Sequence, residues 1–187
     1  MSSARARMLI EGALALGIVA ALGVFHWVTY SAATMRPSEP GWAEIAWPFP
    51  MDQWGRGAAF RCKAADCGAD ISLYLRPKIG FCNCTTGVSD DPELERVADV
   101  SLLDDRYTPL APGRPIKVGR MEGRSRPYVV DRAARDKVLA VAFNERCDVI
   151  VATAVVAHAQ PAAFEPAVLA FLNGDTVLRW AEAKLGL

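Results

Sequence analysis

An uninterrupted apolar segment near the N-terminus, residues 8–30, constrains this chain more than any other feature of its sequence. The segment reads MLIEGALALGIVAALGVFHWVTY and carries no formal charge between residues 12 and 28. At about 1.5 Å of rise per residue, about 20 helical residues cross the hydrocarbon core of a bilayer. We therefore expect a single transmembrane helix over residues 8–30, preceded by a cytoplasmic tail of residues 1–7.

The flanks of this segment predict its orientation. Arg5 and Arg7 precede it, and Trp27 and Tyr30 lie at its far end, where aromatic rings favour the headgroup layer. Because basic residues stay on the cytoplasmic side, we expect an inner (plasma) membrane protein whose C-terminal part is periplasmic or otherwise extracytoplasmic. The alternative is a signal peptide cleaved near residues 31–33, although the apolar stretch exceeds the usual about 7–15 residues.

The sequence favours a membrane-protein partner over a nucleic acid. The apolar segment is rich in small residues, which allow transmembrane helices to approach closely. These residues are Gly12, Ala13, Gly17, Ala20, Ala21 and Gly23. The 21 basic side chains are balanced by 21 acidic ones, so the chain lacks the basic footprint of a general nucleic-acid-binding protein.

Residues 31–57 are predicted to form a semi-rigid stalk, because they are rich in proline, which disfavours regular ladders. The prolines are Pro37, Pro40, Pro48 and Pro50, and the tryptophans among them are Trp42, Trp47 and Trp54. Exposed aromatic side chains at this density often mark contacts with a partner. The simpler alternative is that the three tryptophans pack on the chain's own domain.

The remaining residues, 58–187, are predicted to form one α+β extracytoplasmic domain. Residues 71–76 alternate apolar and polar side chains, as in a strand that Pro77 ends or places at a sheet edge. Capping residues at 89–93 begin a helix that runs to about residue 99. Short strands near residues 116–118 and 128–130 are predicted to be joined as a hairpin.

The last third of the chain completes this prediction. Residues 131–145 are expected to form a helix, with a strand at 138–142 as the alternative. Residues 147–156 are typical of a central strand buried on both faces. Residues 164–172 and a segment capped by Asp175 are expected to be C-terminal helices. The result is a small, mostly antiparallel sheet with helices on one face.

Five cysteines limit the chemistry of the domain: Cys62, Cys67, Cys82, Cys84 and Cys147. In an oxidising compartment the default is disulfides. Cys82 and Cys84 are too close in sequence to bridge to each other easily. We therefore expect each of them to pair with Cys62 or Cys67, with roughly 2–4 kcal/mol of stabilisation per bridge. Cys147 is expected to be a small buried hydrophobic side chain.

Two other uses of the clustered cysteines remain open. Four thiolates can hold zinc, and two can hold Cu(I), although C-x4-C and C-x-C depart from the usual zinc spacing. Thiol redox chemistry at residues 82–84 is the second, although redox pairs normally follow C-x-x-C. His26 and His158 are the only histidines, so few imidazole ligands or bases are available.

A basic stretch in the predicted hairpin is a candidate binding surface. Five cations fall between residues 114 and 126: Arg114, Lys117, Arg120, Arg124 and Arg126. On a strand of period two, several of them project from one face. They are suited to anionic lipid headgroups or an acidic partner. The alternative is a solvated hairpin whose charges are balanced by acids elsewhere.

The sequence contains no nucleophile elbow, phosphate-binding loop, dinucleotide fingerprint or zinc-protease motif. It therefore predicts a membrane-anchored, non-catalytic accessory or assembly subunit of a membrane-associated complex, with no cofactor. The alternative is a periplasmic protein that binds zinc or copper, or exchanges thiols, through the clustered cysteines.

Overall fold

The computed structural model describes residues 41–131, 136–156 and 159–187. The chain divides into two compact units, Met1–Met35 and Arg36–Leu187, and every described residue belongs to the second. The expected transmembrane helix and cytoplasmic tail lie outside the described residues. Within the described residues, no helix is long and apolar enough to cross a membrane.

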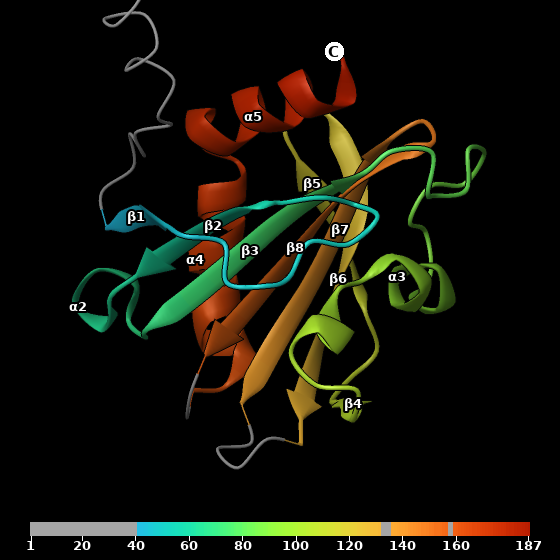
Figure 1. The fold of residues 1–187 in the computed structure, drawn as a ribbon. Helices are drawn as coiled ribbons and strands as arrows, with labels where there is room; N and C mark the ends of the chain where they lie inside the picture. The colour runs from blue at the N-terminus through green and yellow to red at the C-terminus, as the bar shows by residue number, and fades with distance from the viewer. Residues whose placement is uncertain (1–40, 132–135, 157–158) are drawn as a thin grey trace, which may run out of the picture. The chain divides into compact units, whose positions relative to one another are not determined.

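An eight-stranded antiparallel sheet forms the body of the domain (Figure 1). Its strands are β1 (Trp42–Ile45), β2 (Ala58–Cys62), β3 (Ile71–Lys78), β4 (Tyr107–Pro109), β5 (Arg114–Val118), β6 (Met121–Val130), β7 (Lys137–Glu145) and β8 (Asp148–Val156). The order across the sheet is β1-β2-β3-β8-β7-β6-β4, and β5 also pairs with β6. The prediction of an α+β domain with an antiparallel sheet is therefore confirmed.

The central strand is β8, which lies between β3 and β7 as its apolar sequence predicts. β3 also forms where expected, but it continues through Pro77 to Lys78. Pro77 therefore does not end the strand. The alternative, that it lies at an edge, fits the pairing, because β2 pairs only as far as Leu75. Beyond that point Pro77 has a single partner strand, in which Ile150 lies opposite it. A missing N–H is tolerated where one side of a strand is unpaired.

Residues 137–145 form strand β7 instead of the expected helix. Its six consecutive residues from Val138 to Phe143 are all buried, because β7 is paired on both edges and covered on both faces. A helix would have directed part of this apolar run into solvent. The alternative of a strand at 138–142 is the correct one.

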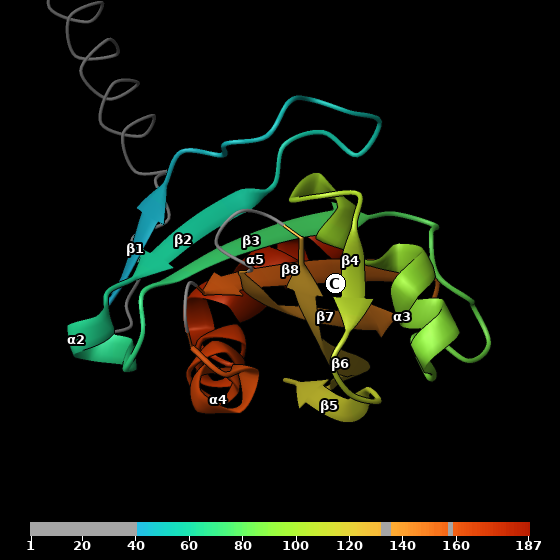
Figure 2. The same cartoon turned by 90° about the horizontal axis from the view of Figure 1, so that it is seen from below.

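Both faces of the sheet are covered, whereas helices on one face were expected. Helices α4 (Pro161–Leu172) and α5 (Asp175–Leu185) lie on one face. The other face carries α3 (Asp91–Val97), the 3-10 turn η2 (Val100–Leu102) and an extended segment, residues 46–57, that we call the strap. Figure 2 shows α4 on one side of the sheet and the strap on the other.

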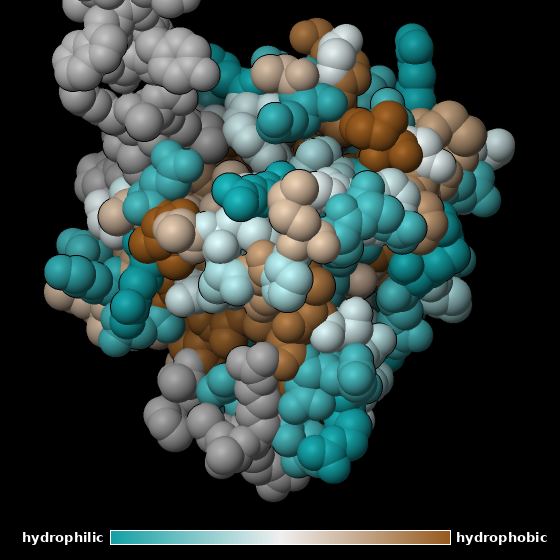
Figure 3. Space-filling model, in the orientation of Figure 1, coloured by the Kyte–Doolittle hydropathy of each residue, from teal (hydrophilic) through white to brown (hydrophobic). Residues whose placement is uncertain are grey.

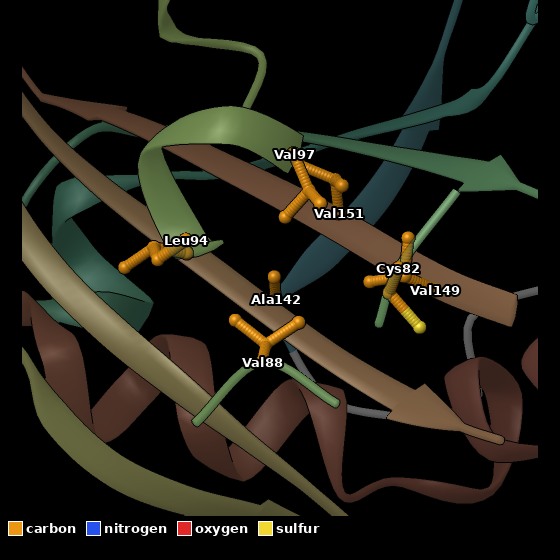
Figure 4. Close-up of a cluster of buried hydrophobic side chains, with 7 residues drawn as sticks. All are labelled: Cys82, Val88, Leu94, Val97, Ala142, Val149 and Val151. Carbon is orange, nitrogen blue, oxygen red and sulfur yellow. The ribbon is translucent and has the colours of Figure 1, made fainter. Parts of the chain in front are cut away.

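α3 begins as its sequence predicts, since Asp90 Oδ1 accepts a hydrogen bond from the Glu93 backbone N–H at 2.8 Å. Gly174, and not Asp175, caps α5. Beneath α3 lies a cluster of seven buried side chains (Figure 4). It joins the segment of residues 79–90 to α3 and to strands β7 and β8. Its members are Cys82, Val88, Leu94, Val97, Ala142, Val149 and Val151.

The strap and β1 belong to the domain, so the expected stalk does not hold for residues 42–57. Trp42 is 7% exposed and stacks on Phe171 of α4, with ring centroids 4.3 Å apart. Trp47 makes edge contacts with Phe49 and Tyr74. Proline keeps the strap extended, and its aromatic side chains fix it across the sheet.

Gly57, where the strap enters β2, shows how closely the strap is held. A Cβ atom at this position would lie 2.6 Å from the Trp47 ring and 2.0 Å from the Leu75 carbonyl oxygen. A residue larger than glycine would therefore displace either the strap or the strand.

Candidate functional site

The cysteines form two disulfides that were not the expected ones. Cys62 bonds to Cys67 and Cys84 bonds to Cys147. Cross-pairing between the first and second cysteine pairs is wrong because these pairs lie at opposite ends of the sheet. Cys62 lies where β3 begins, opposite Ile71, whereas Cys84 bonds to the β7–β8 turn near the other end of β3.

Cys147 is not a buried hydrophobic side chain, since it lies in the turn between Glu145 and Asp148 and carries the second disulfide. A site of four thiolates is likewise contradicted, because Cys62, Cys67 and Cys84 are all in bridges. Within the described residues, no group of three or more His, Cys, Asp or Glu residues is placed to hold a metal. His158 lies outside the described residues.

Cys82 is the free cysteine of the five, and it lies beside the second disulfide. Its side chain is buried and its thiol donates to the Arg146 carbonyl oxygen at 3.1 Å. Its backbone N–H donates to the Cys147 carbonyl oxygen, also at 3.1 Å. Burial, together with the charges of Glu93 and Asp148, raises the pKa of the Cys82 thiol to about 11.

A buried cluster of charges joins the strap to the sheet. Arg76 of β3 is 3% exposed and makes two hydrogen bonds to Asp99, at 2.8 and 2.6 Å. Its third bond, at 2.5 Å, is to Asp52 of the strap. Lys78, two residues along β3, lies 2.8 Å from Asp99 and donates to the Val97 carbonyl oxygen at 2.6 Å. The cluster therefore connects three segments of the chain.

Burial lowers the pKa of Lys78 and the charge of Asp99 opposes that shift. The Trp54 and Phe81 rings lie over its ammonium group, 5.7 and 5.5 Å from their centroids. Arg76 and Lys78 share one face of β3, and α3 and the strap cover that face. Neither residue was predicted to belong to a charge cluster, because their partners come from segments distant in the sequence.

A concave surface lies between residues 86–89 and the β5–β6 hairpin, and we call it the hairpin groove. Its volume is about 490 Å³. Apolar atoms of Val88, Pro115 and Ile116 line it, and its polar lining residues are Thr86, Ser89, Lys117, Glu122 and Asn144. Apolar surface with a few polar groups is the usual form of a binding site.

One wall of the hairpin groove is held by specific bonds. Asn144 Oδ1 accepts from the Val88 backbone N–H at 3.0 Å, and Cys84, at the start of this wall, is fixed by its disulfide. Gly87 has a φ of +60°, and a Cβ there would lie 2.4 Å from Asn144 Oδ1. The wall therefore depends on glycine at this position.

A second hollow, of about 410 Å³, lies on the other side of β5 against α4. Glu165 of α4 is buried beside it, accepts a hydrogen bond from Ser125 at 2.8 Å and pairs with Arg114. Ile116 lines both this hollow and the hairpin groove, so a change at Ile116 alters both concave surfaces.

The basic stretch is balanced by acids, which favours the solvated alternative over a free basic face. Each of the five cations has an acidic partner: Arg114 with Glu165, Lys117 with Glu122, Arg120 with Glu145, Arg124 with Asp91, and Arg126 with Glu95 and Asp91. The side chains of Arg124 and Arg126 are only 18% and 15% exposed. Those of Arg114, Lys117 and Arg120 are about two-thirds exposed or more.

The surface viewed in Figure 3 carries hydrophobic residues in separate patches among hydrophilic ones. The largest exposed apolar side chains include Met51 at 65% and Ile79 at 56%. Trp42, Trp47 and Trp54, expected as contacts of a stalk, all make ring contacts within the domain.

Comparisons with known proteins identify no family for this chain. No protein-family model matches it, and no curated protein sequence matches it. Among solved structures, it is similar to the solution structure of cyanobacterial PsbP (CyanoP) from Synechocystis sp. PCC 6803. The TM-score is 0.44 at 9% identity, over 71% of this chain and 79% of that chain. A similarity this distant carries no argument about function.

Proposed function

We propose that this chain is a non-catalytic accessory or assembly subunit of a membrane-associated complex, with its folded domain outside the cytoplasm. The observation that carries the proposal is the pair of disulfides, Cys62–Cys67 and Cys84–Cys147. Structural disulfides persist in oxidising compartments and are rare in the cytosol. The disulfides support an extracytoplasmic domain. Arg5 and Arg7, which precede the apolar segment, support the same compartment by an independent argument.

The arrangement of buried charges supports a binding role over a chemical one. Arg76 and Lys78 both bind Asp99, and Arg76 also binds Asp52, which holds the strap on the sheet. Glu165 is likewise engaged by Ser125 and Arg114. These groups fix the shape of the domain, and that shape presents the hairpin groove as a recognition surface.

A cross-linking experiment tests both the compartment and the partner. Sealed membrane vesicles of each orientation, carrying the tagged full chain, are treated with a membrane-impermeant amine-reactive cross-linker and then dissolved in detergent. Lys117, at the hairpin groove and 72% exposed in its side chain, is one of the reactive amines. We expect a discrete cross-linked complex with an integral membrane protein, formed only when the extracytoplasmic face is outward.

A matched pair of variants identifies the surface. Ile116→Glu places a charge in both hollows and is expected to reduce the cross-linked complex at least tenfold. Ile79→Glu makes the same change at an exposed site outside the hollows and is expected to leave the yield unchanged. Near-ultraviolet circular dichroism confirms that both variants are folded. Equal yields from the two variants, recovery of the chain alone, or a complex formed from the cytoplasmic face contradicts the proposal.

A further inference from the structure

A buried thiol lies directly against a disulfide at the turn between β7 and β8. Cys82 is 7% exposed, and its thiol and backbone N–H bind the carbonyl oxygens of Arg146 and Cys147. Cys84, two residues away, is exposed and bonded to Cys147. Two cysteines of one short segment therefore lie beside the same partner, and only one of them can bond to it at a time.

We propose that Cys82, Cys84 and Cys147 form an internal thiol–disulfide exchange unit that converts Cys84 into a reactive surface thiol. The Cys82 thiolate attacks Sγ of Cys147, and a Cys82–Cys147 bond forms as the Cys84–Cys147 bond breaks. Cys84 leaves as a thiolate and takes up the proton that Cys82 lost. One thiol and one disulfide are present before and after, so the step needs no external oxidant or reductant.

Cys82 lies next to Cys147 in the folded chain. Its backbone N–H donates to the Cys147 carbonyl oxygen at 3.1 Å, and its thiol donates to the carbonyl oxygen of the preceding residue, Arg146, also at 3.1 Å. Both contacts hold Cys82 against the turn that carries Cys147, and a disulfide needs Cα atoms only about 4.4–6.8 Å apart. Figure 4 shows the Cys82 sulfur at the margin of its cluster, directed away from Leu94 and Val97. Its approach to Cys147 leaves the contacts of α3 in place.

The exchange changes how the hairpin groove is held. In the structure, the Cys84 bridge ties the wall of residues 84–89 to the β7–β8 turn. After exchange the covalent tie moves to Cys82. The wall keeps the hydrogen bond from Val88 N–H to Asn144, and the adjacent Asn83 N–H keeps its bond to Glu93. The new thiol lies at the exposed start of that wall, where molecules that carry a disulfide or an electrophile can modify it.

The burial of Cys82, with two acids beside it, keeps this exchange slow at neutral pH. Burial raises the pKa of the Cys82 thiol to about 11, with Glu93 of α3 and Asp148 of β8 adding to the shift and Arg96 of α3 opposing it. The attacking species is the thiolate, whose fraction rises about tenfold per pH unit below the pKa. The rate of exchange is therefore expected to rise about tenfold from pH 7 to pH 8 and again from pH 8 to pH 9.

Alkylation of the native chain tests the proposal. The full chain in detergent, without reductant, is incubated with N-ethylmaleimide at pH 7, 8 and 9, quenched with acid and digested for disulfide mapping by mass spectrometry. The expected product carries the adduct on Cys84 and a Cys82–Cys147 disulfide, and it accumulates about tenfold faster per pH unit. Cys82→Ser leaves four bridged cysteines and no attacking thiol, so native labelling is expected to fall at least tenfold. The site of the adduct in the native chain then distinguishes exchange from direct alkylation of Cys82.

Two results overturn the proposal. One is an adduct on Cys82 with the Cys84–Cys147 bridge intact, which identifies direct reaction of the buried thiol. The other is a native chain that is not labelled at any of these pH values although the denatured chain is labelled at Cys82. Both are read on the unmodified sequence, so the test stands even if Cys82→Ser does not fold. Neither result bears on whether a membrane partner is captured.

Discussion

At the scale of single residues, the most consequential feature is that two buried cations share one buried anion. Arg76 and Lys78 both contact Asp99, and among the described residues Asp52 is the only other acid bonded to Arg76. A buried ion pair contributes little over a well-packed apolar one, but removing a single partner leaves an uncompensated charge. Asp99 is therefore the residue on which this cluster depends.

Asp99→Asn is expected to destabilise the domain by about 3–5 kcal/mol, because two cations then remain buried without their shared carboxylate. Urea unfolding at pH 7 measures this loss. Asp105→Asn, at an exposed acid, is the control and is expected to change stability by less than about 0.5 kcal/mol. Adding Lys78→Met to Asp99→Asn should recover part of the loss. A loss below about 1 kcal/mol for Asp99→Asn would show that water reaches the cluster.

Local residue patterns predicted some features of single elements but not the contacts of side chains. The N-terminal cap of α3 and the alternation of β3 follow from local chemistry, and both are found. Asp99, which follows α3, and Asp52 of the strap bind Arg76, and the partners of Arg114, Arg124 and Arg126 come from α4 and α3. Such contacts depend on tertiary packing, which no local pattern encodes.

At the scale of elements, β1 and the strap decide where the domain begins. β1 supplies one edge of the sheet, with Trp42 opposite Cys62 in the ladder. The strap covers the face that α3 leaves open and is bonded there through Asp52. Both lie before residue 58, the expected start of the domain. The expected start is too late because an extended proline-rich sequence has the same pattern whether it is free or packed.

A chain that begins at Arg36 is expected to fold cooperatively, whereas one that begins at Ala58 is not. The shorter chain lacks the Trp42–Phe171 stack and leaves Arg76 with one carboxylate instead of two. Thermal unfolding followed by near-ultraviolet circular dichroism distinguishes them. A sharp transition in the shorter chain, within a few degrees of that of the longer one, would restore residue 58 as the boundary.

The strand β7 was mistaken for a helix for a related reason. Its residues 138–143 are all apolar, so a helical stripe and a doubly buried strand fit the run equally well. The choice is made by β6 and β8, which pair with both its edges. The helices α4 and α5, which have clear ends at residues 173–174, left no such ambiguity.

At the scale of the whole molecule, the two disulfides stabilise the fold by different amounts. Cys62–Cys67 closes a sequence separation of 5 residues, and Cys84–Cys147 closes one of 63. The longer closure removes more conformational freedom from the unfolded chain. Neither pairing follows from spacing, because the long bridge joins residues that only the finished sheet brings together.

Replacing Cys84 and Cys147 together by Ser is expected to cost about 4 kcal/mol of stability, and replacing Cys62 and Cys67 together about 2 kcal/mol. Both values come from the conformational entropy that the unfolded chain gains when a bridge is removed. Denaturant unfolding without reductant measures them. The two double variants serve as controls for each other, since each removes one bridge. Equal losses, or a larger loss for the short bridge, would contradict an origin in the unfolded state.

The position of β8 between β3 and β7 also determines when the sheet can be completed during synthesis of the chain. The second edge of β3, complete at Lys78, has no partner until Asp148–Val156 emerges. During that interval the edge is open to unwanted pairing. The Cys62–Cys67 bridge can close within the first segment, whereas Cys82 and Cys84 are both unbonded until Cys147 arrives. Synthesis of the C-terminal third therefore determines when the sheet is completed. It also determines when Cys82 and Cys84 first meet Cys147, and so which of them bonds to it first.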